Sequence, residues 1–363
     1  MSKLDDLMKD INKKFKDEIM VKGVKWEKVD IKIPFSSPRA NYMTYGGIPL
    51  GRAVQFFGEK NGGKTTTSLD IVANAQKLFK KQSEETGEPA KEVLFIDAEN
   101  TLDEEWATTL GVDLESLRLL RPHAQSAEDL FQIIIEAVET GEVGLIVLDS
   151  VGVLLSNAAW EANMDERTYC GIAGPLTVFT GKITPLLHRY HCTLIYINQV
   201  RDVINAKFPM QSTPGGRALA HSLSLNIKFQ KGSFIDNLGA ELKSNAENPD
   251  GNLVMMSIEK TKVCRPDRRT GFYTLNYKEG IDKINDLIDL CMKQGIIDQA
   301  GAWFTVNNWN KLVETGEIEP AMMNDKDIMK FQGRSKLVQY FKENVDIASE
   351  VNQTLLKLLN EDK

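Results

Sequence analysis

Long hydrophobic runs are absent: no stretch of the 363 residues approaches the roughly 18 apolar residues of a membrane-spanning helix. The first residues, MSKLDDLMKDINKKFKDE, alternate acidic and basic side chains and lack the apolar segment of a signal peptide. Cysteine is scarce as well, with no C-x-x-C pair and no metal-type spacing among Cys170, Cys192, Cys264 and Cys291. We therefore expect a reduced, cytoplasmic compartment in which at least two of these cysteines are small core residues.

An excess of basic charge is also missing. The chain has 44 Lys and Arg against 51 Asp and Glu, which gives a net charge of −7. This balance argues weakly against a protein that binds nucleic acid over its whole surface. A local basic site remains compatible with it, because binding depends on where charges lie and not on their sum.

A phosphate-binding loop is the strongest motif that is present. The apolar run AVQFF (53–57) leads into Gly58-x-x-x-x-Gly63-Lys64-Thr65 and then a helical pattern, which is typical of a Walker A loop. Its glycines let backbone N–H groups converge on anionic oxygens, and the helix N-terminus adds partial positive charge. We expect Lys64 to reach the β- and γ-phosphates and the Thr65 hydroxyl to hold Mg²⁺. The residues predicted to bind the nucleotide here are Gly58, Glu59, Lys60, Asn61, Gly62, Gly63, Lys64, Thr65 and Thr66.

Strand and helix patterns alternate after this loop. The expected strands are 93–97, 117–122, 144–150 and 192–199, and the expected helices are 64–81, 126–139 and 173–190. Nearly continuous apolar strands separated by helices predict a parallel sheet that is covered on both faces. Beyond residue 220, successive strands predict an antiparallel extension of that sheet. Residues 1–30 are expected to form an amphipathic helix, which either folds onto its own domain or docks on a neighbouring subunit.

Two acidic residues stand at the ends of apolar strands, where α/β folds place their ligands. Asp149, in GLIVLDS, fits a Walker B carboxylate that holds Mg²⁺ together with Thr65. Glu99, in LFIDAEN, can orient the water that attacks the γ-phosphate. Position alone does not decide between Glu99 and Asp97 for this role.

Two segments are too long or too irregular for ordinary connections, namely residues 156–174 and 200–218. The second combines cations, apolar side chains and glycines, which suits phosphate neutralisation and the support of unpaired bases. The alternative is a lid over the nucleotide. The residues predicted to bind DNA are Arg167, in the first segment, and Arg201, Ile204, Lys207, Phe208, Gly215, Gly216 and Arg217, in the second.

Several motifs together resemble the RecA family of recombinases, in its bacterial or phage-type branch. They are Gly58–Thr66, FIDAENTLD, LIVLDSVGVLL, LIYINQVR, TPGGRAL and DQAGAWF, in this order, and the similarity covers roughly residues 40–350. The resemblance implies an α/β fold with a RecA-like P-loop NTPase core and a mostly parallel central sheet. The implied domains are an N-terminal helical arm (1–33), the ATPase core with its DNA-binding loops (34–280) and a small C-terminal α/β domain (281–363).

The resemblance also implies roles for single residues. Glu99 would activate water, and Gln199 would sense the γ-phosphate. Asp103 would hydrogen-bond the adenine while Trp106, where the family usually has a tyrosine, stacks on it. From the neighbouring subunit, Lys260 and Lys262 would reach the γ-phosphate and Tyr277 would line the pocket. His221 and Ala220 depart from the family's phenylalanine and lysine, which leaves filament regulation open.

The function implied is an ATP-dependent DNA recombinase. With ATP and Mg²⁺ as cofactors, it would assemble into a helical filament on single-stranded DNA and pair the bound strand with double-stranded DNA. No membrane partner is expected. The alternatives are a helicase or clock-type ATPase of the same superfamily, or a metabolic P-loop kinase.

Overall fold

The computed structural model describes residues 2–15, 20–21, 31–123, 125–163, 171–202, 211–236, 239–306 and 330–361. The chain divides into two compact units, residues 1–31 and 32–363. The first unit contains helix α1 (Lys3–Phe15), whose Leu4 and Leu7 are exposed. The amphipathic helix expected at the N-terminus is therefore present.

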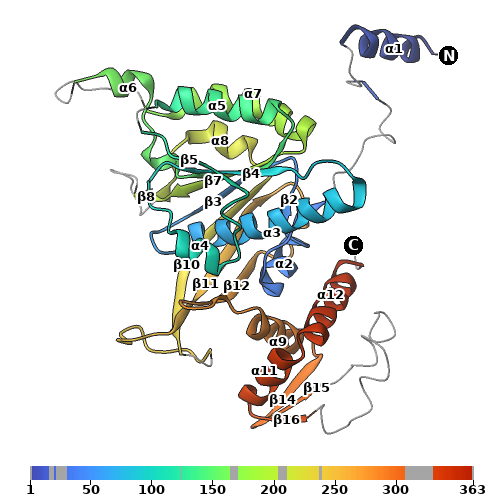
Figure 1. Cartoon of the computed structure of the whole chain (residues 1–363), viewed down its shortest axis with the longest axis vertical. Helices are drawn as coiled ribbons and strands as arrows, with labels where there is room; N and C mark the ends of the chain where they lie inside the picture. The colour runs from blue at the N-terminus through green and yellow to red at the C-terminus, as the bar shows by residue number, and fades with distance from the viewer. Residues whose placement is uncertain are drawn as a thin grey trace. The chain divides into compact units, whose positions relative to one another are not determined.

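A nine-stranded sheet forms the centre of the second unit (Figure 1). Its strands are β13 (Gly280–Ile281), β12 (Thr270–Asn276), β11 (Gly251–Thr261), β10 (Leu225–Ile235), β3 (Ala53–Gly58), β7 (Thr193–Gln199), β6 (Val143–Asp149), β4 (Glu92–Asp97) and β5 (Leu117–Leu120), in this spatial order. All pairings from β10 to β5 are parallel, and those from β10 to β13 are antiparallel. This confirms the predicted α/β fold with a mostly parallel sheet and an antiparallel extension.

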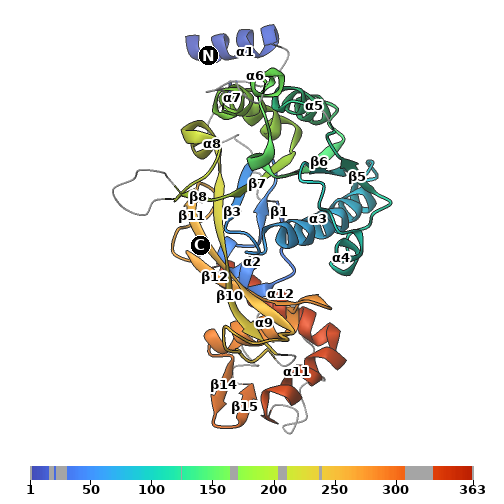
Figure 2. The ribbon, with the colours of Figure 1, turned by 90° about the vertical axis from the view of Figure 1, so that its left-hand side faces the viewer.

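Helices cover both faces of the parallel part, as its nearly continuous apolar strands require. Helix α3 (Lys64–Thr86) lies on one face, and α5 (Ala127–Glu139) and α7 (Ala173–Tyr190) lie together on the other (Figures 1 and 2). Under α5 and α7, the rings of Phe131 and Phe179 stack with centroids 4.3 Å apart. This apolar packing holds α5 and α7 against the sheet, and the ends of the strands of that sheet form the candidate site.

Short elements connect these layers. They are β1 (Lys32–Ile33), α2 (Pro38–Thr44), β2 (Ile48–Pro49), α4 (Glu104–Thr109), the 3₁₀ helix η2 (Val151–Val153), α6 (Asn157–Glu161), β8 (Arg201–Asp202), β9 (Gln211–Ser212) and α8 (Gly216–Ser222). Among the described helices, none combines the length and the apolar character needed to cross a membrane.

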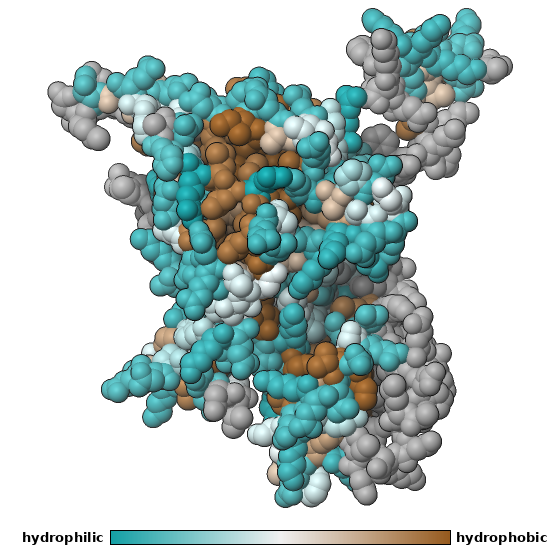
Figure 3. Space-filling view, in the orientation of Figure 1, coloured by the Kyte–Doolittle hydropathy of each residue, from teal (hydrophilic) through white to brown (hydrophobic). Residues whose placement is uncertain are grey.

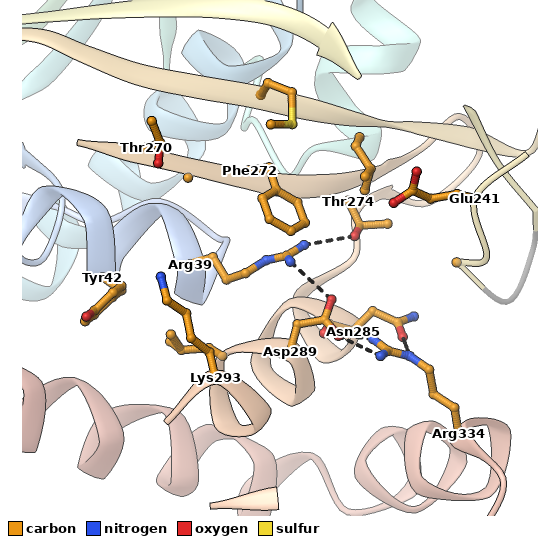
Figure 4. Close-up of a pocket in the computed structure, with 15 residues that line it drawn as sticks. Arg39, Tyr42, Glu241, Thr270, Phe272, Thr274, Asn285, Asp289, Lys293 and Arg334 are labelled. Carbon is orange, nitrogen blue, oxygen red and sulfur yellow. Dashed lines mark hydrogen bonds and ion pairs between the residues drawn. The ribbon is translucent and has the colours of Figure 1, made fainter. Parts of the chain in front are cut away.

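The C-terminal region is a small α/β layer with its own apolar core. It contains α9 (Lys283–Lys293), β14 (Ile297–Ala300), β15 (Trp303–Val306), β16 (Lys330–Gln332), α11 (Arg334–Glu343) and α12 (Val345–Glu361). A polar cluster joins α9 to α2 and β12, and Figure 4 shows part of it in a cavity of about 520 Å³. Helix α9 packs on α2, and residues 32–363 form one compact unit. The domain boundary expected at residue 281 therefore stays a prediction.

Candidate active site

The loop between β3 and α3 can form only with glycine at two of its positions. A Cβ on Gly58, whose φ is +150°, would lie 2.0 Å from the Phe229 carbonyl oxygen of the neighbouring strand. Gly63 caps α3 in the left-handed region, with φ +90° and ψ 10°. Both conformations are ones that side-chain-bearing residues rarely adopt. The motif is thus placed between a strand and a helix N-terminus, as a Walker A loop requires.

Lys64 points into this loop. Its Nζ donates to the carbonyl oxygens of Gly58 at 3.2 Å and Glu59 at 2.6 Å. Burial lowers the pKa of the Lys64 ammonium, while the nearby carboxylates of Asp149 and Glu99 raise it. Among the described residues, these hydrogen bonds of the buried ammonium go to neutral carbonyl oxygens, and such a cation attracts anionic phosphate oxygens strongly.

Thr65 and Asp149 meet at the carboxyl edge of the sheet. The Thr65 hydroxyl donates to Oδ2 of Asp149 at 2.7 Å. Burial raises the pKa of the Asp149 carboxyl to about 6, and the negative charges of Glu99 and Asp97 add to the shift. A hydroxyl and an undercompensated carboxylate beside a phosphate loop are oxygen ligands that fit Mg²⁺, which usually takes one or two carboxylates together with substrate phosphates.

The structure separates the two candidates for the water-activating carboxylate. Asp97 accepts the backbone N–H groups of Thr101 and Leu102, each at 3.0 Å, so its carboxylate holds the turn after β4. Oε1 of Glu99 accepts instead from two side chains, the Ser150 hydroxyl at 2.5 Å and the Gln199 amide at 3.1 Å. Glu99 is therefore the carboxylate that side chains at the ends of neighbouring strands can reposition, which favours it as the general base.

Trp106 and Asp103 lie at the start of α4. The indole Nε1 of Trp106 donates to the Thr66 hydroxyl at 3.3 Å, which brings this ring next to the phosphate-loop helix. Asp103 caps α4 by accepting the Trp106 backbone N–H at 2.9 Å. An aromatic face beside the loop suits a nucleobase.

The two lysines expected to act on a neighbouring subunit do not point at their own phosphate loop. The Lys260 Nζ donates to the carbonyl oxygens of Ala220 and His221 at 2.5 and 3.1 Å, and the Lys262 Nζ donates to that of His221 at 2.9 Å. In the sheet, Lys260 pairs with Asn226, and Asn226 pairs with Gln55 of β3. Lys260 therefore lies level with the middle of β3 and not with the phosphate loop that follows this strand. Lys262 is exposed, whereas Lys260 is partly buried.

Tyr277 is 41 % exposed, and its hydroxyl donates to Oδ1 of Asn252 at 2.9 Å. The residue is thus partly open to solvent although its hydroxyl is bonded to the buried Asn252. A partner molecule can therefore reach it, as the expected role in a shared pocket requires.

The two long segments leave the sheet from β6 and β7. An exposed arginine, Arg201, donates to the Gly152 carbonyl oxygen at 2.8 Å and so joins the start of the second segment to η2, which precedes the first. Gly215 and Gly216 both have positive φ, and a Cβ on Gly215 would lie 2.6 Å from Leu176. Arg217 is exposed on α8. The remaining predicted DNA contacts lie outside the described residues; they are Arg167, Ile204, Lys207 and Phe208.

Sequence reasoning missed two buried polar residues. Ser150 follows Asp149 directly, and Asn198 precedes Gln199, so their positions beside strand-end residues were the available signal. The Asn198 amide donates to the Pro214 carbonyl oxygen at 2.8 Å, and its Oδ1 accepts the Gln199 backbone N–H at 3.0 Å. Asn198 thereby links the end of β7 to the far end of the second segment.

Comparisons with known proteins agree with this geometry. Residues 2–282 match the family model described as the RecA N-terminal domain. The chain is 33 % identical to Protein RecA of Clostridium acetobutylicum over 311 residues, which is 85 % of this chain and 77 % of that protein. It is 32 % identical to Protein RecA of Wolbachia and 30 % identical to that of Thermotoga maritima, each over 98 % of this chain and 90 % of the relative. The chain belongs to the RecA family.

Proposed function

We propose that this protein is a DNA-dependent ATPase that assembles on single-stranded DNA and catalyses homologous pairing and strand exchange with a duplex. Family membership and the site's geometry support this proposal together. The observation that carries it is that Ser150 and Gln199 both hydrogen-bond Glu99. Gln199 directly precedes the second long segment, and the chain runs from Ser150 through η2 towards the first.

The chain's own groups would divide the work on the nucleotide. Lys64 and the loop N–H groups would bind phosphates, Trp106 would stack on the base, and Asp103 would hydrogen-bond it. Thr65 and Asp149 would hold Mg²⁺, which when bound supplies positive charge to the phosphate oxygens. Glu99 would take a proton from the attacking water, and Gln199 would respond to the γ-phosphate.

Self-assembly would complete the site. Lys260 lies level with Gln55, before its own phosphate loop, and Lys262 donates to the His221 carbonyl oxygen of α8. Both would serve the γ-phosphate of a neighbour, with Tyr277 beside it. Strand β5 is an edge of the sheet, where Leu119 is 38 % exposed and Ile133 of the adjacent α5 is 36 % exposed. Figure 3 shows apolar side chains gathered on this face of the molecule. An apolar sheet edge favours pairing with another copy of the chain.

DNA would lie along the two segments. Arg201, Arg217 and Lys207 would neutralise phosphates, Ile204 and Phe208 would support the bases, and the backbone at Gly215 and Gly216 would approach the strand closely. Arg167 would add a phosphate contact from the first segment. Pairing between strands would supply sequence specificity, so we expect backbone contacts rather than base-edge contacts.

A strand-exchange assay tests this function. Purified protein with ATP and Mg²⁺ is incubated with a single strand and either a homologous or a heterologous duplex, and the displaced strand is measured. We expect displacement only with the homologous duplex, and none with the Lys64→Ala variant. Absence of displacement under conditions where the protein hydrolyses ATP on DNA would contradict strand exchange and favour a helicase-type or clock-type motor.

A further inference from the structure

Ser150 occupies a distinctive position in the site. It is 1 % exposed and follows Asp149 at the end of β6, and its hydroxyl donates to Oε1 of Glu99 at 2.5 Å. The same oxygen accepts the Gln199 amide. Two donors on one oxygen fix the direction of a carboxylate more firmly than either donor alone.

The backbone around Ser150 leads directly into the first long segment. Residues Val151–Val153 form the 3₁₀ helix η2, and the Gly152 carbonyl oxygen accepts the Arg201 guanidinium. Glu99, Ser150, η2, Arg201 and Gln199 thus form a closed ring of covalent and hydrogen-bonded links. Only one residue, Val151, separates Ser150 from Gly152, so a displacement of η2 can be transmitted to the Ser150 hydroxyl.

We propose that Ser150 is a positioning residue that holds Glu99 in a resting orientation when no DNA is bound, and that DNA binding releases it by displacing η2 and the Arg201 contact to Gly152. The proposal rests on the proposed function and assigns η2 a regulatory role at the carboxylate, beside the role of Gln199 for the second segment. Ser150 acts only through Glu99.

The test measures ATP hydrolysis by Ser150→Ala with and without an unstructured single-stranded oligonucleotide. Loss of one hydrogen bond to a carboxylate should raise the DNA-independent kcat by about threefold to tenfold. The DNA-stimulated kcat should change little, so the ratio of stimulated to basal rate should fall by the same factor. The KM for ATP should stay within about twofold of wild type, because the phosphate loop is intact.

Ser37→Ala is the matched control. Ser37 is another buried serine whose hydroxyl donates to a carboxylate, that of Asp286, but it lies at α2 and makes no contact with Glu99. Its removal should lower the melting temperature and leave both rates and their ratio unchanged. Any general effect of losing a buried hydroxyl would appear in this control.

Three other outcomes would overturn the proposal. An unchanged ratio in Ser150→Ala, with wild type stimulated by DNA, would show that Ser150 does not couple DNA to Glu99. An equal fall of both rates would show that Ser150 only orients Glu99 for catalysis. If wild type itself shows no DNA stimulation, the proposed function fails and the regulatory role fails with it.

Discussion

Two buried aspartates at different parts of the second unit have the same raised pKa but opposite surroundings. Asp149, at the phosphate loop, and Asp286, on α9, each have a pKa raised by burial to about 6. Asp286 accepts the Ser37 hydroxyl, the Arg39 guanidinium and the Thr274 backbone N–H. Within the described residues, Asp149 accepts a side-chain hydrogen bond from Thr65 and has the charges of Glu99 and Asp97 nearby.

The difference shows which burial is structural. The Asp286 carboxylate is compensated by donors of its own chain, and Arg39 also contacts Asp289, which binds Arg334 of α11 (Figure 4). This cluster fastens the C-terminal layer to α2 and β12. The Asp149 carboxylate accepts one side-chain hydrogen bond, from Thr65, and it has the positive charge of Lys64 nearby as well as two negative neighbours. It is therefore less fully compensated than Asp286, and a bound cation would add positive charge beside it.

The largest effects are expected at the candidate site. Lys64→Ala should abolish ATP binding, because the phosphates lose their buried cation. Glu99→Gln should still bind ATP and assemble, yet its kcat should fall by about 10⁴-fold, since only the proton transfer from water is removed. Fluorescent-nucleotide binding and steady-state hydrolysis separate the two. A Glu99→Gln protein that hydrolyses ATP at the wild-type rate would remove Glu99 from the mechanism.

The next effect concerns the lysines that cap α8. Changing Lys260 and Lys262 together to alanine should lower ATP hydrolysis by about 10³-fold, the low end for cations supplied in trans. Nucleotide binding to the isolated subunit should persist. Mixing this variant with Glu99→Gln should restore activity, because complementary halves then meet across an interface. Full activity of the lysine variant as a dilute monomer would refute a shared site.

A paired substitution tests the contrast between the two aspartates themselves. Asp286→Asn should lower the free energy of unfolding by about 3 kcal/mol, because it leaves the buried Arg39 with a weaker partner. Asp149→Asn should change it by no more than about 0.5 kcal/mol, or raise it, because an unfavourable buried charge disappears. Denaturant unfolding measures both, and each variant serves as the other's control. If both variants lowered the free energy of unfolding equally, the proposed difference between Asp286 and Asp149 would be wrong.

The smallest effect is a pH dependence of Mg²⁺-dependent ATP binding. With a pKa of about 6, Asp149 is mostly ionised at pH 7.5 and mostly protonated at pH 5.5. A cation must displace that proton, so the affinity should fall by about fourfold over this interval. Calorimetric titrations check this after the separately measured titration of ATP with Mg²⁺ is subtracted. An affinity independent of pH would show that Asp149 is not a ligand.

The sequence indicated where the candidate site lies because the signals for it are local. The loop from Gly58 to Thr65 is one contiguous motif, and Asp149 and Glu99 each end a recognisable apolar strand. Parallel strands bring such ends to one edge, so their proximity follows from the fold class. The choice of Glu99 over Asp97 came from family resemblance, and the hydrogen bonds of Asp97 now give it a physical reason.

The polar cluster around Asp286 could not be predicted from the sequence. Ser37 and Asp286 are separated by 249 positions, and no periodicity or motif links them. Ser150 was missed for another reason: which side chain reaches Glu99 depends on strand register and on atomic positions that residue spacing does not encode. The same holds for Lys260, whose contact with the α8 carbonyls made it less exposed than a lysine on a solvated strand.

We propose that the sheet edge around Glu99 couples ATP hydrolysis to DNA through Ser150 and Gln199 and the segments that follow them. The most direct measurement is the rate of ATP hydrolysis by the wild-type protein as unstructured single-stranded DNA is added at fixed ATP and Mg²⁺. We expect a slow rate without DNA and a saturable increase whose midpoint shifts to higher DNA concentration as salt rises. A rate that is unaffected by DNA at every salt concentration would contradict the account and favour a metabolic P-loop kinase or another DNA-independent ATPase.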